Sequence, residues 1–168
     1  MAKVLYFSYD GLLDPLGQSQ IVPYVSAISN AGYSLTVVSY EKVKRTKEQI
    51  KFMEIKLQKI GVNWVRLEFR SSKLWAIKRL ISGILLIRKL CRDLQPDFLH
   101  LRGFVPSLIF QLCRSKVPFL YDFRGFALGE WVDSGKITQS SLVYRFLNQL
   151  DRKAVNNASG LVVLEESA

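Results

Sequence analysis

Short apolar runs alternate along the chain with longer segments of helical periodicity. The runs are rich in β-branched and aromatic residues and predict strands at 4–10, 35–41, 62–69, 98–103, 119–125 and 161–167. The intervening segments predict helices at 19–31, 44–60, 74–94, 104–115 and 139–157. Strands that are apolar on both faces and are joined by helices indicate a mostly parallel sheet with helices on both sides. We therefore expect a doubly wound, Rossmann-like α/β domain of six or more strands, in the order 3-2-1-4-5-6.

Length and composition indicate one globular domain in a reducing cytoplasm. The chain has 168 residues, 49% of them hydrophobic, which is enough for one core. Cys91 and Cys113 lie in apolar helical patterns without the spacing of a metal site, so we expect reduced thiols and no metal. There is no signal-peptide pattern and no apolar run long enough to cross a membrane. Because the chain stops after its sixth predicted strand, we expect it to be a fragment cut at a domain boundary.

Positive charge is concentrated in one region. The net charge is +10, and residues 42–59 hold seven Lys and Arg against two Glu, while residues 66–92 hold eight against one Glu. Such a patch attracts polyanions, either nucleic acid or an anionic lipid surface. A solvated, lysine-rich face is the alternative interpretation.

The first predicted strand leads into a glycine-containing loop. Asp10 ends this strand, and Gly11 and Gly17 precede the first predicted helix. Ligands of doubly wound sheets bind beyond the carboxyl ends of the strands, where glycine and a helix N-terminus can approach a phosphate. The loop lacks both G-x-G-x-x-G and the Walker pattern. A phosphate-binding loop and a simple turn therefore both remain open.

Charged residues also end the fourth and fifth predicted strands. His100 and Arg102 are two positions apart, and so are Asp122 and Arg124, which places each pair on one face of its strand. Glu130 follows in the next loop. A guanidinium at the end of a central strand suits a phosphate or carboxylate, and Asp122 or Glu130 could pair with the arginines in an empty site. A hydrogen-bonded core histidine and a structural Asp122–Arg124 pair are the alternatives.

Four sequence segments together resemble a known family. The segments VLYFSYDGLLDPLGQSQIVPYV, DFLHLRGFVPSLIF, YDFRGFALGE and LDRKAVNNASGLVVLEES are similar to the N-terminal domain of bacterial family 4 retaining glycosyltransferases of GT-B architecture. The most specific motif is D-x-R-G-x-x-x-x-E, from Asp122 to Glu130, preceded by H-x-R-G at His100. The chain departs from many relatives at two places. Where they have consecutive glycines in the first loop, this chain has Leu16-Gly17. Where they have H-x-H, it has His100-Leu101-Arg102.

The resemblance implies half of a hexosyltransferase that builds polysaccharides. The enzyme would move a sugar from a nucleotide-sugar donor to a glycan or lipid-linked acceptor, with retention and without a cofactor or metal. A C-terminal domain outside this chain would hold most of the donor, so the isolated domain would be inactive. The resemblance implies that Gly17 and Gln18 approach the donor diphosphate and that His100 and Arg102 face the transferred sugar. It further implies that Arg124 and Glu130 position the acceptor, with Asp10 and Asp122 on the acceptor side.

The basic segment 74–93 projects as an amphipathic helix that could meet a membrane. Ile77 falls on its apolar side, and Gly83 falls on its polar side. The residues predicted to face an anionic membrane are Trp75, Lys78, Arg79, Leu86 and Lys89. We expect a cytoplasmic protein, peripheral on the inner face of the cytoplasmic membrane, and no bound nucleic acid. The alternatives are a solvated helix packed on the sheet, a basic nucleic-acid-binding module, and a nucleotide-sugar epimerase, against which the missing G-x-G-x-x-G argues.

Overall fold

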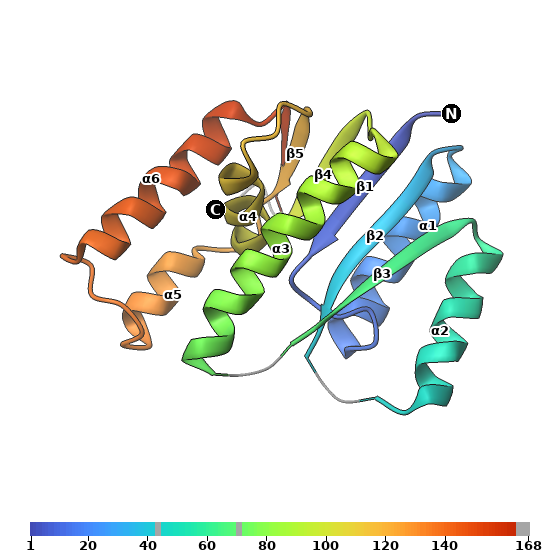
Figure 1. Cartoon of the computed structure of the whole chain (residues 1–168), viewed down its shortest axis with the longest axis horizontal. Coiled ribbons are helices and arrows are strands. Elements are labelled where there is room, and N and C mark those ends of the chain that lie inside the picture. The colour runs from blue at the N-terminus through green and yellow to red at the C-terminus, as the bar shows by residue number, and fades with distance from the viewer. Residues whose placement is uncertain (43–44, 70–71, 164–168) are drawn as a thin grey trace.

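The computed structural model contains one six-stranded, all-parallel sheet in the order β3-β2-β1-β4-β5-β6 (Figure 1), which confirms the predicted topology. It describes residues 1–42, 45–69 and 72–163. The strands are β1 Lys3–Ser8, β2 Ser34–Glu41, β3 Val62–Glu68, β4 Phe98–Arg102, β5 Phe119–Asp122 and β6 Gly160–Val162. A π-helical turn, η1 Gly17–Ile21, precedes the helices α1 Val22–Asn30, α2 Lys47–Lys59, α3 Lys73–Leu94, α4 Phe104–Cys113, α5 Ala127–Asp133 and α6 Leu142–Asn157.

The predicted elements differ from the observed ones mainly near the C-terminus. The predicted strand at 119–125 ends at Asp122, because Gly125 adopts a φ of 128° and the short helix α5, which the sequence pattern did not predict, begins at Ala127. The predicted strand at 161–167 is observed as β6, and residues 164–168 lie outside the described residues. Lys44, where the second helix was predicted to begin, also lies outside them. The described helix α2 begins after Thr46, whose side chain forms a capping box with Gln49.

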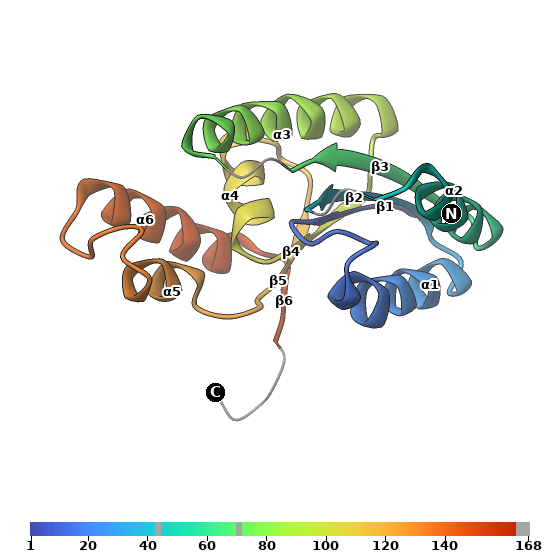
Figure 2. The same ribbon diagram turned by 90° about the horizontal axis from the view of Figure 1, so that it is seen from below.

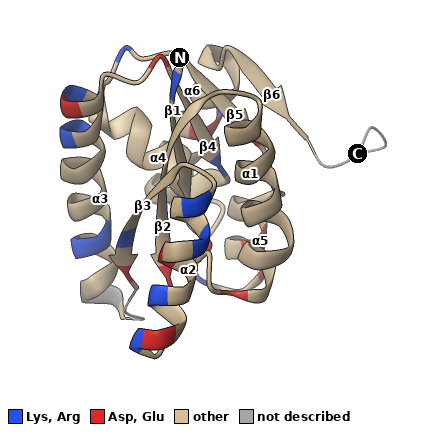
Figure 3. Ribbon diagram, turned by 90° about the vertical axis from the view of Figure 1, so that its right-hand side faces the viewer, with Lys and Arg blue, Asp and Glu red and all other residues tan. Residues whose placement is uncertain are grey.

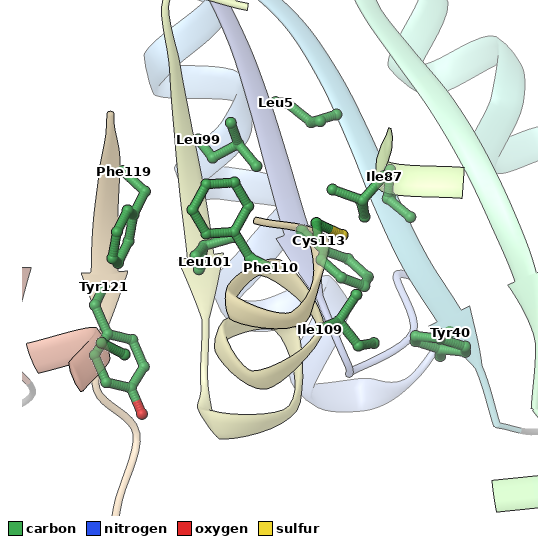
Figure 4. Packing of buried hydrophobic residues seen from close by; sticks show 13 residues of the cluster. Leu5, Tyr40, Ile87, Leu99, Leu101, Ile109, Phe110, Cys113, Phe119 and Tyr121 are labelled. Atoms are coloured by element: carbon green, nitrogen blue, oxygen red, sulfur yellow. The ribbon is translucent and has the colours of Figure 1, made fainter. Parts of the chain in front are cut away.

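Helices cover both faces of the sheet (Figure 2). On one face, α3, α4 and α6 bury the first core cluster; Figure 4 shows Phe110 of α4 beside Leu99 and Leu101 of β4, and Ile109 on the side toward Tyr40. On the other face, α1 and α2 bury a second cluster around Tyr6 and the remaining side chains of β1, β2 and β3. Burial on both faces explains why the strands read as continuous apolar runs.

The predicted orientation of α3 is wrong at three positions. Gly83 is buried, and a Cβ at this position would lie 2.7 Å from the hydroxyl of Tyr40 and 2.9 Å from Ile109, so the helix crosses the core at its smallest side chain. Leu86 packs against the first core cluster, whereas Ile77 is 60% exposed. The rest of the predicted apolar side faces the core: Ile87 belongs to the first core cluster, and Leu80, Ile84 and Cys91 pack against it.

Candidate functional site

A buried carboxylate with three basic partners lies at the carboxyl ends of β4 and β5. Asp122 is fully buried, and its two oxygens are 2.7 Å from Nε and 2.8 Å from Nη2 of Arg124. The same carboxylate is 3.5 Å from Nη1 of Arg102 and 3.2 Å from Nε2 of His100. Sequence reasoning had grouped these four residues, and the structure brings them together around Asp122.

The strand register explains why these side chains meet. Arg102 of β4 lies directly opposite Asp122 of β5, and His100 precedes Arg102 by one full strand period. Both strands end there. The chain then leaves β5 through Arg124, which curls back onto the Asp122 carboxylate. The cluster therefore occupies the edge of the sheet where doubly wound folds bind ligands.

Opposing effects set the charge of Asp122. Burial alone would raise the pKa of this carboxyl, but hydrogen bonds from His100 and Arg124 and the positive charge of Arg124 outweigh burial and lower it below its usual value. Asp122 is therefore a fixed negative charge near neutral pH. With Arg102 and Arg124 both cationic, the cluster retains an excess of positive charge that suits an anionic group of a ligand.

Two tyrosine rings pack against the imidazole of His100. The ring of Tyr6 stacks on the imidazole at 4.6 Å between centroids, and Tyr24 of α1 meets it edge-on at 5.3 Å. His100 is 1% exposed, so in this conformation it braces Asp122 and does not face open space. Burial raises the pKa of Tyr6, whose hydroxyl lies beside Arg102. Sequence reasoning missed both tyrosines, because the Tyr6–His100 pairing depends on the register between β1 and β4.

Further charged and polar side chains extend the line of charges from Asp122 across the sheet toward β2. Arg102 donates from Nη2 to Oε1 of Gln20 at 2.6 Å, and its Nε is 3.9 Å from Asp10. Lys42, just after β2, pairs with the other oxygen of Asp10 at 2.7 Å. Together with Asp122, these residues make an alternating row of charges along four strand ends. Asp10 had been predicted at this edge; Gln20 and Lys42 had not, since no local pattern marks them.

Two backbone donors of the first loop are paired with a carboxylate from the end of β2. Glu41, at the end of β2, accepts hydrogen bonds from the backbone N–H groups of Leu12 at 2.9 Å and Leu13 at 3.3 Å. Gly17 is buried, and a Cβ there would overlap the carbonyl oxygen of Gly11. A carboxylate of the chain thus occupies these amides, and Gly17 has a packing reason to be glycine.

Gln18 and Glu130, the two remaining predicted site residues, make no contact with Asp122 among the described interactions. The side chain of Gln18 donates to the carbonyl of Leu13 at 3.2 Å, within the first loop. Glu130 is exposed on α5, and its carboxylate is 3.5 Å from where a Cβ of Gly125 would lie. The diphosphate role of Gly17 and Gln18 and the acceptor role of Glu130 remain predictions.

The structure separates the predicted membrane-facing residues of α3. Lys78 and Lys89 are exposed, and the Lys78 ammonium lies 4.8 Å from the ring of half-buried Trp75. The guanidinium of half-buried Arg79 lies 4.4 Å from the ring of Phe69. Blue bands along α3 mark its cationic positions in Figure 3. Leu86 belongs to the core, so its predicted exposure is wrong.

A row of aliphatic side chains takes the place of Leu86 on the exposed side of α3. Ile77, Ile81 and Leu85 are each more than half exposed and follow one another at four-residue intervals. None of the described helices is both long and apolar enough to cross a membrane. Within residues 1–42, 45–69 and 72–163, no group of three His, Cys, Asp or Glu side chains is placed to hold a metal ion.

Comparison with known proteins identifies the fold. No protein-family model matches the sequence, and no curated protein matches it. Sucrose-phosphate synthase from Thermosynechococcus elongatus matches in structure with a TM-score of 0.60 and 10% identity, over 96% of this chain and 42% of that one. UGT73P12 from Glycyrrhiza uralensis, complexed with glycyrrhetinic acid 3-O-monoglucuronide, matches with a TM-score of 0.56 and 9% identity, over 98% and 44%. A glycosyltransferase from Rickettsia africae matches with a TM-score of 0.51 and 14% identity, over 98% and 42%.

The chain spans less than half the length of each of these proteins. It has the fold of one Rossmann-like half of GT-B glycosyltransferases, at low sequence identity.

Proposed function

We propose that this chain is the acceptor-side half of a retaining glycosyltransferase. The full enzyme moves a sugar from a nucleotide-sugar donor to a glycan or lipid-linked acceptor. The observation that carries the proposal is the charged row from Asp10 to Arg124, which lies at the ligand-binding edge of a fold shared with glycosyltransferases.

The chemistry of the row suits the departure of a diphosphate. Sugar transfer from a nucleotide sugar develops positive charge at the anomeric carbon and negative charge on the leaving diphosphate. Asp122 holds Arg124 through two contacts and contacts Arg102, so both guanidinium groups are oriented before substrate arrives. Fixed cations stabilise the leaving group because they need no reorganisation during the reaction. Arg124 is the partly exposed member, which makes it the arginine that meets substrate.

His100 acts in this proposal through Asp122 and does not act as a base. Its Nε2 faces the carboxylate, and the rings of Tyr6 and Tyr24 cover it. The imidazole thereby fixes the rotamer of Asp122, and Asp122 fixes the arginines. Exposed Glu130 lies at the rim beside Gly125, where it can accept a hydrogen bond from an acceptor hydroxyl.

The remaining parts of the enzyme are proposed to lie in a second domain outside this chain. The matched structures are more than twice the length that this chain covers, which leaves room for another domain. That domain would hold the nucleotide and close on the edge of the sheet where Arg124 lies. The binding partners of the chain are then its own C-terminal domain, the nucleotide-sugar donor and the acceptor.

The exposed face of α3 is proposed to lie on an anionic membrane surface. Its aliphatic row of Ile77, Ile81 and Leu85 lies near two exposed lysines, Lys78 and Lys89. Apolar groups beside cations are typical of helices at a lipid interface. The helix starts at the same edge of the sheet as the charged row, so docking would bring that edge near a lipid-linked acceptor.

The test is steady-state kinetics of the full-length enzyme carrying Arg124→Ala. We expect turnover to fall at least about tenfold, because losing about 1.4 kcal/mol of transition-state stabilisation is enough for that factor. Arg145→Ala, which removes an exposed arginine of α6, is the matched control and should leave turnover unchanged. Unchanged kinetics for Arg124→Ala, or measurable sugar transfer by residues 1–168 alone, would contradict the proposal.

A further inference from the structure

A groove of about 1020 Å³ runs along the outer strand β3 and over the carboxyl end of β2. It lies at the opposite end of the strand order from β5 and β6, and none of the residues proposed for catalysis lines it. Trp64, Arg66 and Glu54 form one wall, and Glu41, Lys42 and Arg45 lie at the end nearest the candidate site. Its volume is at the upper end for small-molecule pockets, so it can hold more than one sugar ring.

The wall is a flat surface held in place by contacts within the protein. Trp64 donates from Nε1 to the hydroxyl of Ser39 at 2.8 Å, and that hydroxyl donates to Glu41 at 2.7 Å. The guanidinium of Arg66 lies 5.4 Å from the centre of the Trp64 ring and pairs with Glu54 at 3.1 Å. The guanidinium lies over the Trp64 ring, so the stacked pair offers a flat surface to the C–H side of a sugar ring and forked donors to its hydroxyls.

Among the described residues that line the groove, positive and negative charges balance, although the chain as a whole carries +10. Three cations, Lys42, Arg45 and Arg66, share this described lining with three carboxylates, Glu41, Glu54 and Glu68. A polyanion such as nucleic acid would meet as much repulsion as attraction from these six side chains. Hydroxyl groups both donate and accept, so a neutral polyol can pair with cations and carboxylates alike.

Among the described residues of the lining, Arg45 has a polar atom without a partner. Its Nε is buried without a hydrogen bond, while Nη2 of the same side chain pairs with Asp14 at 3.3 Å. A buried donor left unpaired costs about 1–3 kcal/mol, which a ligand hydroxyl or a water molecule would recover. Arg45 also lines a second hollow of about 430 Å³ with Gln49 and Phe52 of α2, so Arg45 lies between two open spaces.

Among the described residues, Lys42 joins the groove to the candidate catalytic edge. Lys42 lines the groove and pairs with Asp10, which in turn lies 3.9 Å from Arg102. A chain-like ligand can therefore extend from Trp64 to the charged row without crossing the body of the domain. We propose that this groove binds a neutral oligosaccharide, and that it holds the non-reacting part of the acceptor. Only the identification of this oligosaccharide as the acceptor rests on the proposed function.

The test measures binding to the 168-residue chain on an array of neutral and uronate-containing oligosaccharides, followed by titration calorimetry with the best neutral probe. We expect binding that weakens at least about tenfold in Trp64→Ala and Arg66→Ala, equivalent to about 1.4 kcal/mol. We further expect affinity to change little when salt is raised, because the recognised groups are uncharged. Phe146→Ala, at an exposed aromatic residue of α6, is the matched control and should bind as the wild type does.

Three results of these measurements would overturn the inference. Failure to bind any neutral oligosaccharide, equal binding by Trp64→Ala, or a preference for acidic glycans that salt abolishes would each do so. Since the Arg66 side chain is 40% exposed, Arg66→Ala is expected to fold, which keeps the test valid even if Trp64→Ala does not fold. Binding at Trp64 by a protein whose full-length form transfers no sugar would uphold the groove and reject the proposed enzyme. Sugar transfer by the full-length protein that is unchanged in Trp64→Ala and Arg66→Ala would uphold the proposed enzyme and reject the groove.

Discussion

Replacing Asp122 with asparagine removes one negative charge from the centre of the buried cluster and leaves the shape almost unchanged. Arg102 is 3% exposed and would then be a buried cation whose remaining carboxylate, Asp10, is 3.9 Å away and partly exposed. Breaking a buried ion pair from one side costs about 3–5 kcal/mol, because the other charge is left uncompensated. Since Arg102 keeps Asp10, we expect the lower end, about 3 kcal/mol. A domain of ordinary stability, about 5–15 kcal/mol, remains folded after that loss.

The assay is urea unfolding followed by circular dichroism. With a slope of about 2 kcal/mol per molar urea, a loss of about 3 kcal/mol lowers the midpoint by about 1.5 M. Asp10→Asn is the matched control; its carboxylate is partly exposed, so we expect a loss below about 1 kcal/mol. Adding Arg102→Met to Asp122→Asn removes the stranded cation and should recover part of the stability.

The pH dependence gives a second measurement. The pKa of Asp122 is lowered in the folded protein, so its contribution to the free energy of unfolding is complete above the ordinary value of 3.8 and is lost as pH falls through the folded pKa. The difference between wild type and Asp122→Asn should therefore be constant near neutral pH and shrink in acid. A loss below about 1 kcal/mol at neutral pH would refute the reasoning, because a buried Arg102 left with only the more distant Asp10 carboxylate should cost more than that. So would a difference that does not change in acid.

Three further predictions concern the first loop, the core thiol and α3. Gly17→Ala should destabilise the domain by about 1–3 kcal/mol in urea unfolding, since its Cβ meets backbone; Gly129→Ala, which meets only a side chain at 3.7 Å, should not destabilise it. Burial raises the pKa of the Cys113 thiol to about 11, so iodoacetamide at pH 8 should modify it at least about 100-fold more slowly in the native protein than in urea, and equal rates would contradict its burial. The chain should sediment with anionic vesicles and not with neutral ones, and changing Lys78 and Lys89 to Glu should abolish this; unchanged sedimentation would leave α3 a solvated helix.

The candidate site shows where reasoning from local sequence succeeds. The two-residue period of a strand is enough to place His100 and Arg102 on one face, and Gly125 is enough to place Asp122 close to a strand end, although β5 ends three residues earlier than predicted. Both features are local, because a strand's side-chain direction depends only on its own backbone. The alternation of strands and helices likewise predicted the topology, since short right-handed crossovers leave few alternatives.

The orientation of α3 shows where the same reasoning fails. An amphipathic projection averages over many positions and tolerates an error of one residue in the buried face. The buried face includes Gly83, which lies against Tyr40, and partly buried Leu86, whereas Ile77 is exposed. Nothing within the helix itself records the size of the side chains that lie opposite it.

The sequence by itself determined the class of fold, the strand order and the edge at which charged side chains gather. Only the tertiary structure decided what those side chains touch. Tyr6 meets His100 through the register of two strands far apart in the chain, and Glu41 reaches the amides of Leu12 and Leu13 across two neighbouring strands. The physical reason is that periodicity and turn chemistry act over a few residues. Hydrogen bonds and ion pairs between distant segments depend on register and packing, which the whole core sets at once.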